Sequence, residues 1–248
     1  MLFCLQPLAQ TPPTILALGQ TLNTIASSGT IRVPRPLAKG IVGDSAILAM
    51  EGIPMATGPD KASQRMLGEA IAAVHATTAP NSLFGFDEDN FIGATPQLNK
   101  WSDSWADFFT ERRLGYQFQL ASKNGCTFRD TGELLDKIHS HLAGLDIAPS
   151  LLHGDLWGGN ASFDSEGAPV IFDPAVYFGD RETDIAFTRM FGGFGPAFHE
   201  SYREHFPAPE PVRETIYNLY HLLNHYNLFG GSYGDQAARA MLEILSVV

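Results

Sequence analysis

Two short apolar stretches with acidic loops interrupt a chain whose C-terminal two thirds otherwise has helical patterning. The stretches read LLHGDLWGGNASFD and APVIFDPA, and a turn over residues 164–167 is expected to join them. Helices are expected over residues 60–78, 101–123, 131–143, 183–191, 196–205, 212–229 and 235–247. Acidic loops set among helices are the first place to look for chemistry.

The N-terminal part predicts only a fragment of a sheet. A short helix is expected over residues 16–26, followed by strands within 31–40 and 46–51 on either side of Gly43-Asp44. Residues 1–17 have neither helical nor alternating periodicity and are broken by three prolines, so no structure is assigned to them.

The strongest local signal is a set of four polar residues around these stretches: His153, Asp155, Asn160 and Asp173. Phosphoryl transfer needs a carboxylate to accept the proton of an attacking hydroxyl, and oxygen ligands to hold Mg²⁺ against nucleotide phosphates. Asp155 and Asn160 reproduce the interval of the kinase catalytic loop, H-x-D-x-x-x-x-N, and Asp173 follows a short apolar strand. The pattern therefore predicts a kinase site.

Four segments extend this pattern: LLHGDLWGGN, VIFDPAVYFGDRETDIA, FGGF and LYHLLNHYNLFGG. They resemble the signature segments of the fructosamine (ketosamine) 3-kinase family, and the resemblance runs from about Ile31 to the end of the chain. It implies an α+β, protein-kinase-like fold of two lobes, related to aminoglycoside and choline kinases. It also implies ATP- and Mg²⁺-dependent phosphorylation of the 3-hydroxyl of a ketosamine, either a small molecule or a sugar on glycated protein.

The resemblance also assigns roles to residues. Asp155 is implied as the catalytic base, and Asn160 and Asp173 as the Mg²⁺ ligands. Trp157 is equally consistent with stacking on the sugar and with core packing. The tripeptide Met50, Glu51 and Gly52 resembles the hinge that offers backbone groups to adenine.

A cluster of charges precedes the predicted helix at 183–191. Asp180, Arg181, Glu182 and Asp184 are interpreted as a helix cap with ion pairs that support the metal loop, in preference to direct catalysis. His153 is similarly interpreted as a buried imidazole that braces the loop backbone.

Three further polar residues share a face of the helix expected over residues 212–229. His221, Asn224 and His225 lie at i, i+3 and i+4, and such a face can bind a sugar or a carboxylate. Metal binding by the two histidines is the less favoured reading, because no third ligand is within sequence reach.

The N-terminal segment departs from the family pattern. No glycine-containing phosphate loop is visible, and the family spacing places Cys4 and Leu18 where a Lys and its Glu partner belong. We therefore expect a remnant N-lobe with its hinge over residues 1–52 and a catalytic C-lobe over 53–248. The contrast between a complete C-lobe pattern and an incomplete N-terminal one favours a misplaced start or a frameshift that makes residues 1–19 non-native sequence.

The charge balance limits the possible partners. The formal net charge is −11 and Lys and Arg form no run, so nucleic acid is not an expected partner. No apolar window is long enough to span a bilayer, no signal peptide is recognisable, and the two cysteines lack metal or disulfide spacing; a cytoplasmic protein without a membrane partner is expected.

Two alternatives to an active ketosamine kinase remain. One is a pseudokinase or sugar-binding module that keeps the pocket but transfers no phosphate. The other is a kinase of another small hydroxyl substrate, such as an aminoglycoside or choline, which the segments LYHLLNHYNLFGG and DPAVYFGDRETD disfavour.

Overall fold

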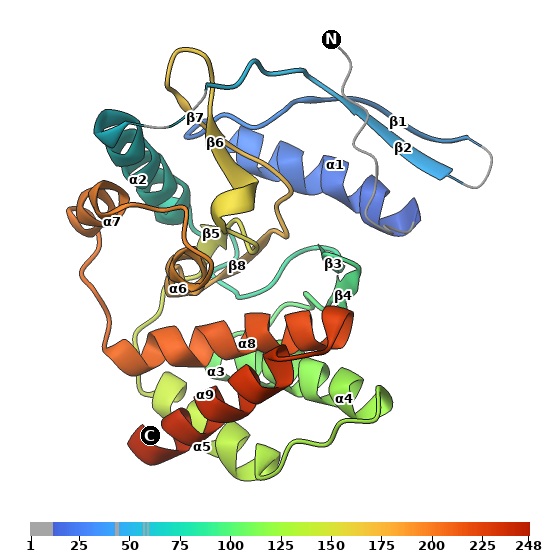
Figure 1. Ribbon diagram of the computed structural model, residues 1–248, viewed down its shortest axis with the longest axis vertical. Coiled ribbons are helices and arrows are strands. Elements are labelled where there is room, and N and C mark those ends of the chain that lie inside the picture. Colours follow the sequence, from blue (N-terminus) through green and yellow to red (C-terminus); the bar gives the residue numbers. More distant parts are fainter. Residues whose placement is uncertain (1–11, 43–44, 57, 59) are drawn as a thin grey trace.

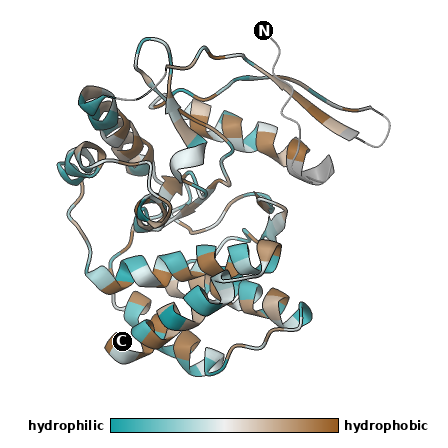
Figure 2. Cartoon of the chain, viewed as in Figure 1, coloured by the Kyte–Doolittle hydropathy of each residue, from teal (hydrophilic) through white to brown (hydrophobic). Residues whose placement is uncertain are grey.

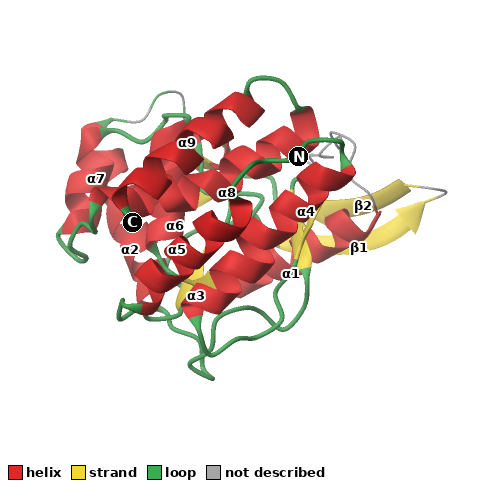
Figure 3. Ribbon diagram, turned by 90° about the horizontal axis from the view of Figure 1, so that it is seen from below, coloured by secondary structure: helices red, strands yellow, loops and turns green. Residues whose placement is uncertain are grey.

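A computed structural model describes residues 12–42, 45–56, 58 and 60–248 (Figure 1). Its N-terminal layer is helix α1 (Pro12–Ser27), which packs on an antiparallel ribbon of β1 (Pro36–Val42) and β2 (Ser45–Met50). Helix α1 buries Ile15, Leu22 and Ile25. The ribbon projects beyond the helices at one side of the molecule (Figure 3).

The predicted helix over 16–26 exists but begins four residues earlier, at Pro12. Leaving residues 12–17 without structure was wrong, because proline is compatible with the first turn of a helix, where its missing N–H has no intrahelical partner. The helix ends before Gly29, whose φ of 66° suits a C-terminal cap. Residues 1–11, including Cys4, and residues 43 and 44 lie outside the described residues.

Helix α2 (Lys61–Ala76) begins at a side-chain cap and lies against α7 (Pro196–Arg203). The Asp60 carboxylate accepts a hydrogen bond from Ser63 N at 2.7 Å, which satisfies one of the free amides of the first turn. The apolar face buries Leu67, Ile71 and Val74.

The predicted hairpin forms, but its strands are shorter than its apolar stretches. Strand β6 (Ala161–Phe163) pairs with β7 (Pro169–Ile171) across the expected turn. The apolar residues before the catalytic loop form β5 (Ser150–Leu152), which pairs instead with β8 (Tyr177–Gly179). A further small hairpin joins β3 (Asn90–Ile92) and β4 (Thr95–Gln97).

The remaining elements build a helical lobe whose apolar and polar residues alternate along the helices (Figure 2). Helix α8 (Pro211–Phe229) contacts both α6 (Glu182–Met190) and α9 (Tyr233–Val247), and α5 (Thr131–Ala143) packs on α3 (Trp105–Asp107) and α9. The region expected as one helix over 101–123 starts at Trp105 and is π-helical in its middle. The other elements are η1 (Phe108–Gly115), α4 (Tyr116–Lys123) and η2 (Gly158–Asn160).

The segment before β1 connects the N-terminal layer to the β6–β7 hairpin through Arg32. Ile171 N donates to Arg32 O at 3.1 Å, and the Arg32 guanidinium lies 2.8 Å from Asp164 and 2.9 Å from Glu51. Over the part of the chain that the structure describes, no helix is both long and apolar enough to cross a membrane.

Candidate active site

The loop that follows β5 carries the predicted catalytic residue. Gly154 has a φ of 80°, and a Cβ at this position would lie 2.0 Å from Ala175 O. Glycine is therefore required by both the left-handed conformation and the close approach of the two loops. Ala175 N donates to His153 O at 2.8 Å, so the loops that carry Asp155 and Asp173 are joined directly.

Asp155 and Asn160 are in contact, as their five-residue interval suggested. Asn160 Nδ2 lies 2.9 Å from both the main-chain oxygen and the Oδ2 of Asp155. Burial raises the pKa of Asp155 to about 7; the hydrogen bond from Asn160 opposes this shift, whereas the negative charges of Asp173 and Asp184 add to it. A carboxylate with this pKa can accept a proton near neutral pH.

Asp173 lies where two cavities meet. The first, of about 480 Å³, contains Asp155, Asn160 and Asp173 in its wall. The second, of about 350 Å³, shares Asp173 and is lined mainly by apolar residues. Asp173 is half-buried and has a φ of 47°, an uncommon conformation for an aspartate, and burial raises the pKa of its carboxyl group.

Among the described residues, the walls of both cavities contain carboxylates but neither Lys nor Arg. The first basic residue of the whole sequence is Arg32, and its guanidinium is bound to Glu51 and Asp164. The positive charge that a polyphosphate needs must therefore come from something other than these walls.

The residues present suit a hard cation such as Mg²⁺. Asn160 uses its Nδ2 group on Asp155, which leaves its Oδ1 oxygen free to act as a ligand, and the Asp173 carboxylate lies in the same cavity. Two protein oxygens are a typical share for Mg²⁺ in sites where phosphates supply other ligands. Within the described ranges, no three His, Cys, Asp or Glu side chains form a metal site of their own.

The predicted substrate residues divide into two groups. Trp157, Asn224 and His225 line the larger cavity, and the Trp157 side chain is 38% exposed. His221 instead lies buried outside the cavity wall, with its ring stacked on that of Phe187 at 3.6 Å, and burial lowers its pKa to about 3.

The predicted hinge borders the smaller cavity. Met50 and Glu51 line it, whereas Gly52 is not part of its wall. Glu51 N donates to Arg35 O at 2.9 Å, and the hydrogen bond from Arg32 lowers the pKa of the Glu51 carboxyl group.

His153 and Asp184 hold the backbone of the catalytic loop. The buried His153 ring accepts from Asp155 N through Nδ1 (3.2 Å) and donates from Nε2 to Phe172 O (2.8 Å), which assigns it a neutral tautomer. Asp184 accepts from His153 N at 2.7 Å, from Gly154 N at 2.9 Å and from His75 Nε2 at 3.1 Å. Burial alone would raise the pKa of Asp184, but these hydrogen bonds keep it below its usual range.

Among the other members of the charged cluster, Asp180 stabilises the start of α6. The Asp180 carboxylate accepts from Glu182 N at 3.0 Å and from the Tyr217 hydroxyl, and it pairs with Arg213. Arg181 lies over the ring of Phe206, 4.3 Å from its centroid.

Asp184→Ala is expected to lower the free energy of unfolding by about 3 to 5 kcal/mol, because it leaves three buried N–H groups without their acceptor. Urea denaturation measures the change. Asp146→Ala, an exposed carboxylate on a loop, is the matched control and should stay within about 0.5 kcal/mol of the wild type. Equal losses in the two variants would contradict a bracing role for Asp184.

Sequence reasoning missed several residues that surround the site. Asn90 lines the larger cavity, and α1 contributes Ala17, Leu18 and Thr21 to the same wall. In the sequence Asn90 follows three acidic residues and resembles an ordinary surface residue. Its strand is only three residues long, too short for a periodic signal that could have identified it.

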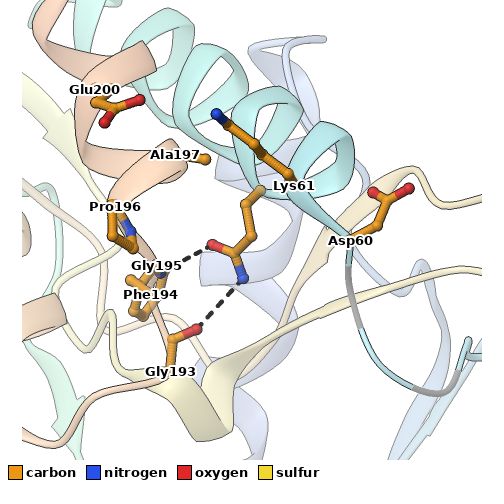
Figure 4. Close-up of a pocket in the computed structure, with 9 residues that line it drawn as sticks. Asp60, Lys61, Gly193, Phe194, Gly195, Pro196, Ala197 and Glu200 are labelled. Atoms are coloured by element: carbon orange, nitrogen blue, oxygen red, sulfur yellow. Dashed lines mark hydrogen bonds between the residues drawn. The ribbon is translucent and has the colours of Figure 1, made fainter.

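A third cavity, of about 600 Å³, lies between the start of α2 and the segment before α7 (Figure 4). Gln64 accepts from Gly195 N at 3.2 Å and lies 3.5 Å from Gly193 O. This segment packs on the catalytic loop, since a Cβ on Gly158 would lie 3.1 Å from Gly193 Cα. The cavity shares no lining residue with the Asp155 cavity, so it is not the candidate active site.

The helical lobe, the His153 to Asn160 loop and the Asp173 loop between two adjoining cavities define a protein-kinase-like phosphotransferase. The α+β fold agrees with solved structures. An aminoglycoside-3'-phosphotransferase of type VIII superimposes with a TM-score of 0.57 over 86% of this chain and 82% of its own, at 19% identity, which supports the fold alone.

Closer similarities identify the family. The fructosamine kinase family model matches residues 14–247. A probable ketoamine kinase of Synechocystis is 45% identical over 93% of this chain and 78% of its own length, and a chloroplastic protein-ribulosamine 3-kinase of Arabidopsis thaliana is 40% identical over 89% and 68%. A putative fructosamine-3-kinase of Haemophilus somnus superimposes with a TM-score of 0.88 at 30% identity, over 94% of this chain and 80% of its own. The chain belongs to the fructosamine kinase family.

Proposed function

We propose that this chain transfers the γ-phosphoryl group of ATP to the 3-hydroxyl of a ketosamine, a fructosamine or ribulosamine borne by an amino acid or by glycated protein. The observation that carries the proposal is the contact of Asp155 with Asn160 beside Asp173, where the two cavities meet. Relatives named ketoamine kinase and protein-ribulosamine 3-kinase support the substrate class.

The smaller cavity is proposed to bind the adenine base. Its apolar wall, which includes Leu22, Ile53 and Phe172, suits a flat aromatic ring. Met50, Glu51 and Gly52 would act as the hinge through backbone groups other than Glu51 N–H, which is bonded to Arg35 O.

Asn160 and Asp173 are proposed to hold Mg²⁺ through their side-chain oxygens. The ion would neutralise the charge of the nucleotide phosphates. The ion would have to supply most of the positive charge, because among the described residues the cavity walls contain no basic side chain.

Asp155 is proposed to orient the substrate 3-hydroxyl and to accept its proton. As the hydroxyl oxygen bonds to phosphorus, the bond to the ADP leaving group breaks and the proton passes to Asp155 Oδ. The exposed indole of Trp157 would contact the sugar, and Asn224 and His225 would border it from α8.

Product analysis tests the proposal. The purified chain is incubated with ATP, Mg²⁺ and fructosyl- or ribulosyl-lysine, and the expected product is the 3-phosphate with one ADP released per phosphate transferred. The analogue that lacks the 3-hydroxyl should give neither. Phosphate on another hydroxyl, or equal turnover of an aminoglycoside or choline, would overturn the substrate assignment.

A pseudokinase or sugar-binding module is the second candidate. The absence of Lys and Arg from the described cavity walls favours weak nucleotide binding and therefore impaired transfer. Ketosamine binding without ADP release would support this candidate. The division into lobes at 1–52 and 53–248 and a cytoplasmic location remain predictions.

A further inference from the structure

Two buried polar side chains, Asn90 and Gln97, donate hydrogen bonds to the backbone just beyond Asp173, and a third, Tyr220, bonds to Gln97. Asn90 Nδ2 donates to Val176 O at 2.7 Å, and Gln97 Nε2 donates to Ala175 O at 2.9 Å and to Asn90 Oδ1 at 2.8 Å. The Tyr220 hydroxyl donates to Gln97 Oε1 at 2.9 Å. The three side chains are exposed by 4%, 1% and 3%, in the order Asn90, Gln97 and Tyr220.

This chain of hydrogen bonds satisfies every polar group of the Gln97 amide. Both of its N–H groups and its oxygen have partners within 2.9 Å. A buried polar network with all its groups satisfied is rigid, and losing one member leaves several others unpaired.

The segment that the network contacts needs support from outside. Asp173 has a φ of 47°, and an aspartate holds such a conformation only when its surroundings impose it. Ala175 is fixed on one side by its N–H bond to His153 O and on the other by the bond from Gln97 to its carbonyl oxygen.

A buried arginine fixes the strand end that carries Gln97. Arg113, in η1, donates to Leu98 O at 2.6 Å and to Asn99 Oδ1 at 2.8 Å, the two residues that follow Gln97. Its guanidinium also lies over the Tyr177 ring, 4.1 Å from the centroid. Within the described part of the chain no carboxylate pairs with Arg113. Its hydrogen bonds hold the two residues that follow β4, and its guanidinium packs on the Tyr177 ring of β8.

We propose that Gln97, with Asn90 and Tyr220, positions the Asp173 loop for metal and nucleotide binding. None of the three is proposed to touch a reacting atom. The inference rests on the proposed role of Asp173 and adds the residues that hold its carboxylate in place.

Gln97→Leu tests this inference against a matched control. Thr110→Val removes another buried hydrogen bond, from the Thr110 hydroxyl in η1 to Ala106 O in α3 at 2.6 Å, and among the described residues no hydrogen bond joins Thr110 to residues 173–176. Calorimetry measures ATP-analogue binding over a range of Mg²⁺ concentrations. Gln97→Leu is expected to raise the Mg²⁺ concentration for half-maximal binding by about 10- to 100-fold, the usual effect of losing a residue that supports a metal ligand. Tyr220→Phe should give a smaller shift, and Thr110→Val none.

Hydrogen exchange without any ligand gives a second measurement. The amides of residues 173–177 should exchange faster in Gln97→Leu than in Thr110→Val, even if both variants lose equal thermal stability. If wild-type nucleotide binding depends on Mg²⁺ and Gln97→Leu shows the same dependence, the inference is overturned but the proposed role of Asp173 is not. Nucleotide binding without any Mg²⁺ dependence in the wild type would overturn the proposed role of Asp173 and the inference with it.

Discussion

Asp155→Asn is expected to lower turnover of a ketosamine substrate by about 10² to 10⁴-fold, the usual contribution of a general base. The amide keeps the shape of the side chain and can still accept a hydrogen bond from Asn160, but it cannot take the proton of the 3-hydroxyl. ADP release with ribulosyl- or fructosyl-lysine measures the loss. The folded structure, followed by circular dichroism, should be unchanged.

Asp136→Asn is the matched control, because this exposed carboxylate on α5 lies in neither of the two joined cavities. It should retain wild-type turnover. Near wild-type turnover in Asp155→Asn would mean that another group accepts the proton.

The pH dependence follows from the same residue. Burial raises the pKa of Asp155 to about 7 in the absence of metal. A cation held beside it would lower this pKa, so kcat/KM should increase with pH, through a midpoint at or below this value, as the carboxylate ionises. Stability should change in the opposite sense, because ionisation of a carboxyl group with a raised pKa is costlier in the native state. Without metal, the melting temperature of Asp155→Asn minus that of the wild type should therefore be greater at pH 8 than at pH 5.

Removal of Mg²⁺ is expected to weaken ATP binding by about two to four orders of magnitude. The described cavity walls supply carboxylates but no Lys or Arg, so in the proposed site the phosphates would depend on a metal ion held by Asn160 and Asp173. Two such charge-assisted contacts at about 1.5 to 3 kcal/mol each account for this range. Calorimetry with Mg²⁺ and with EDTA gives the comparison.

Asp173→Ala should be more harmful to ATP binding than Asn160→Ala, because it removes a full negative charge opposite the cation. Asp136→Asn again serves as the control. Micromolar ATP binding in EDTA would contradict the metal bridge, and an unchanged Mg²⁺ requirement in Asp173→Ala would place the metal elsewhere.

The centre of the site was predictable from the sequence for a physical reason, whereas the fold class was implied by the resemblance to the fructosamine kinase family. The interval between Asp155 and Asn160 lets the two side chains meet across one short loop, and the structure brings them to 2.9 Å. The long helices were predictable because their buried faces recur every three to four residues, as in α5, where Leu134, Ile138 and Leu142 are buried.

The surroundings of the site were not predictable in the same way. Strand β8 is three residues long and buried throughout, so it has no alternation to recognise. The roles of Asn90 and Gln97 depend on hydrogen bonds to the carbonyl groups of Val176 and Ala175, about 80 residues later in the chain, and a local sequence pattern does not show them. The stacking of His221 on Phe187 is a tertiary contact between two helices, and helical spacing alone could not separate it from its neighbours Asn224 and His225.

The shared position of Asp173 in two cavity walls has a thermodynamic consequence. Two ligands that contact the same side chain are expected to affect each other's binding, because each can change the position and charge of the carboxylate that the other contacts. By linkage, whatever factor the nucleotide applies to the affinity of the sugar, the sugar must apply to the affinity of the nucleotide. We therefore expect the proposed nucleotide and sugar pockets to bind their ligands cooperatively, through the half-buried carboxylate that lines both.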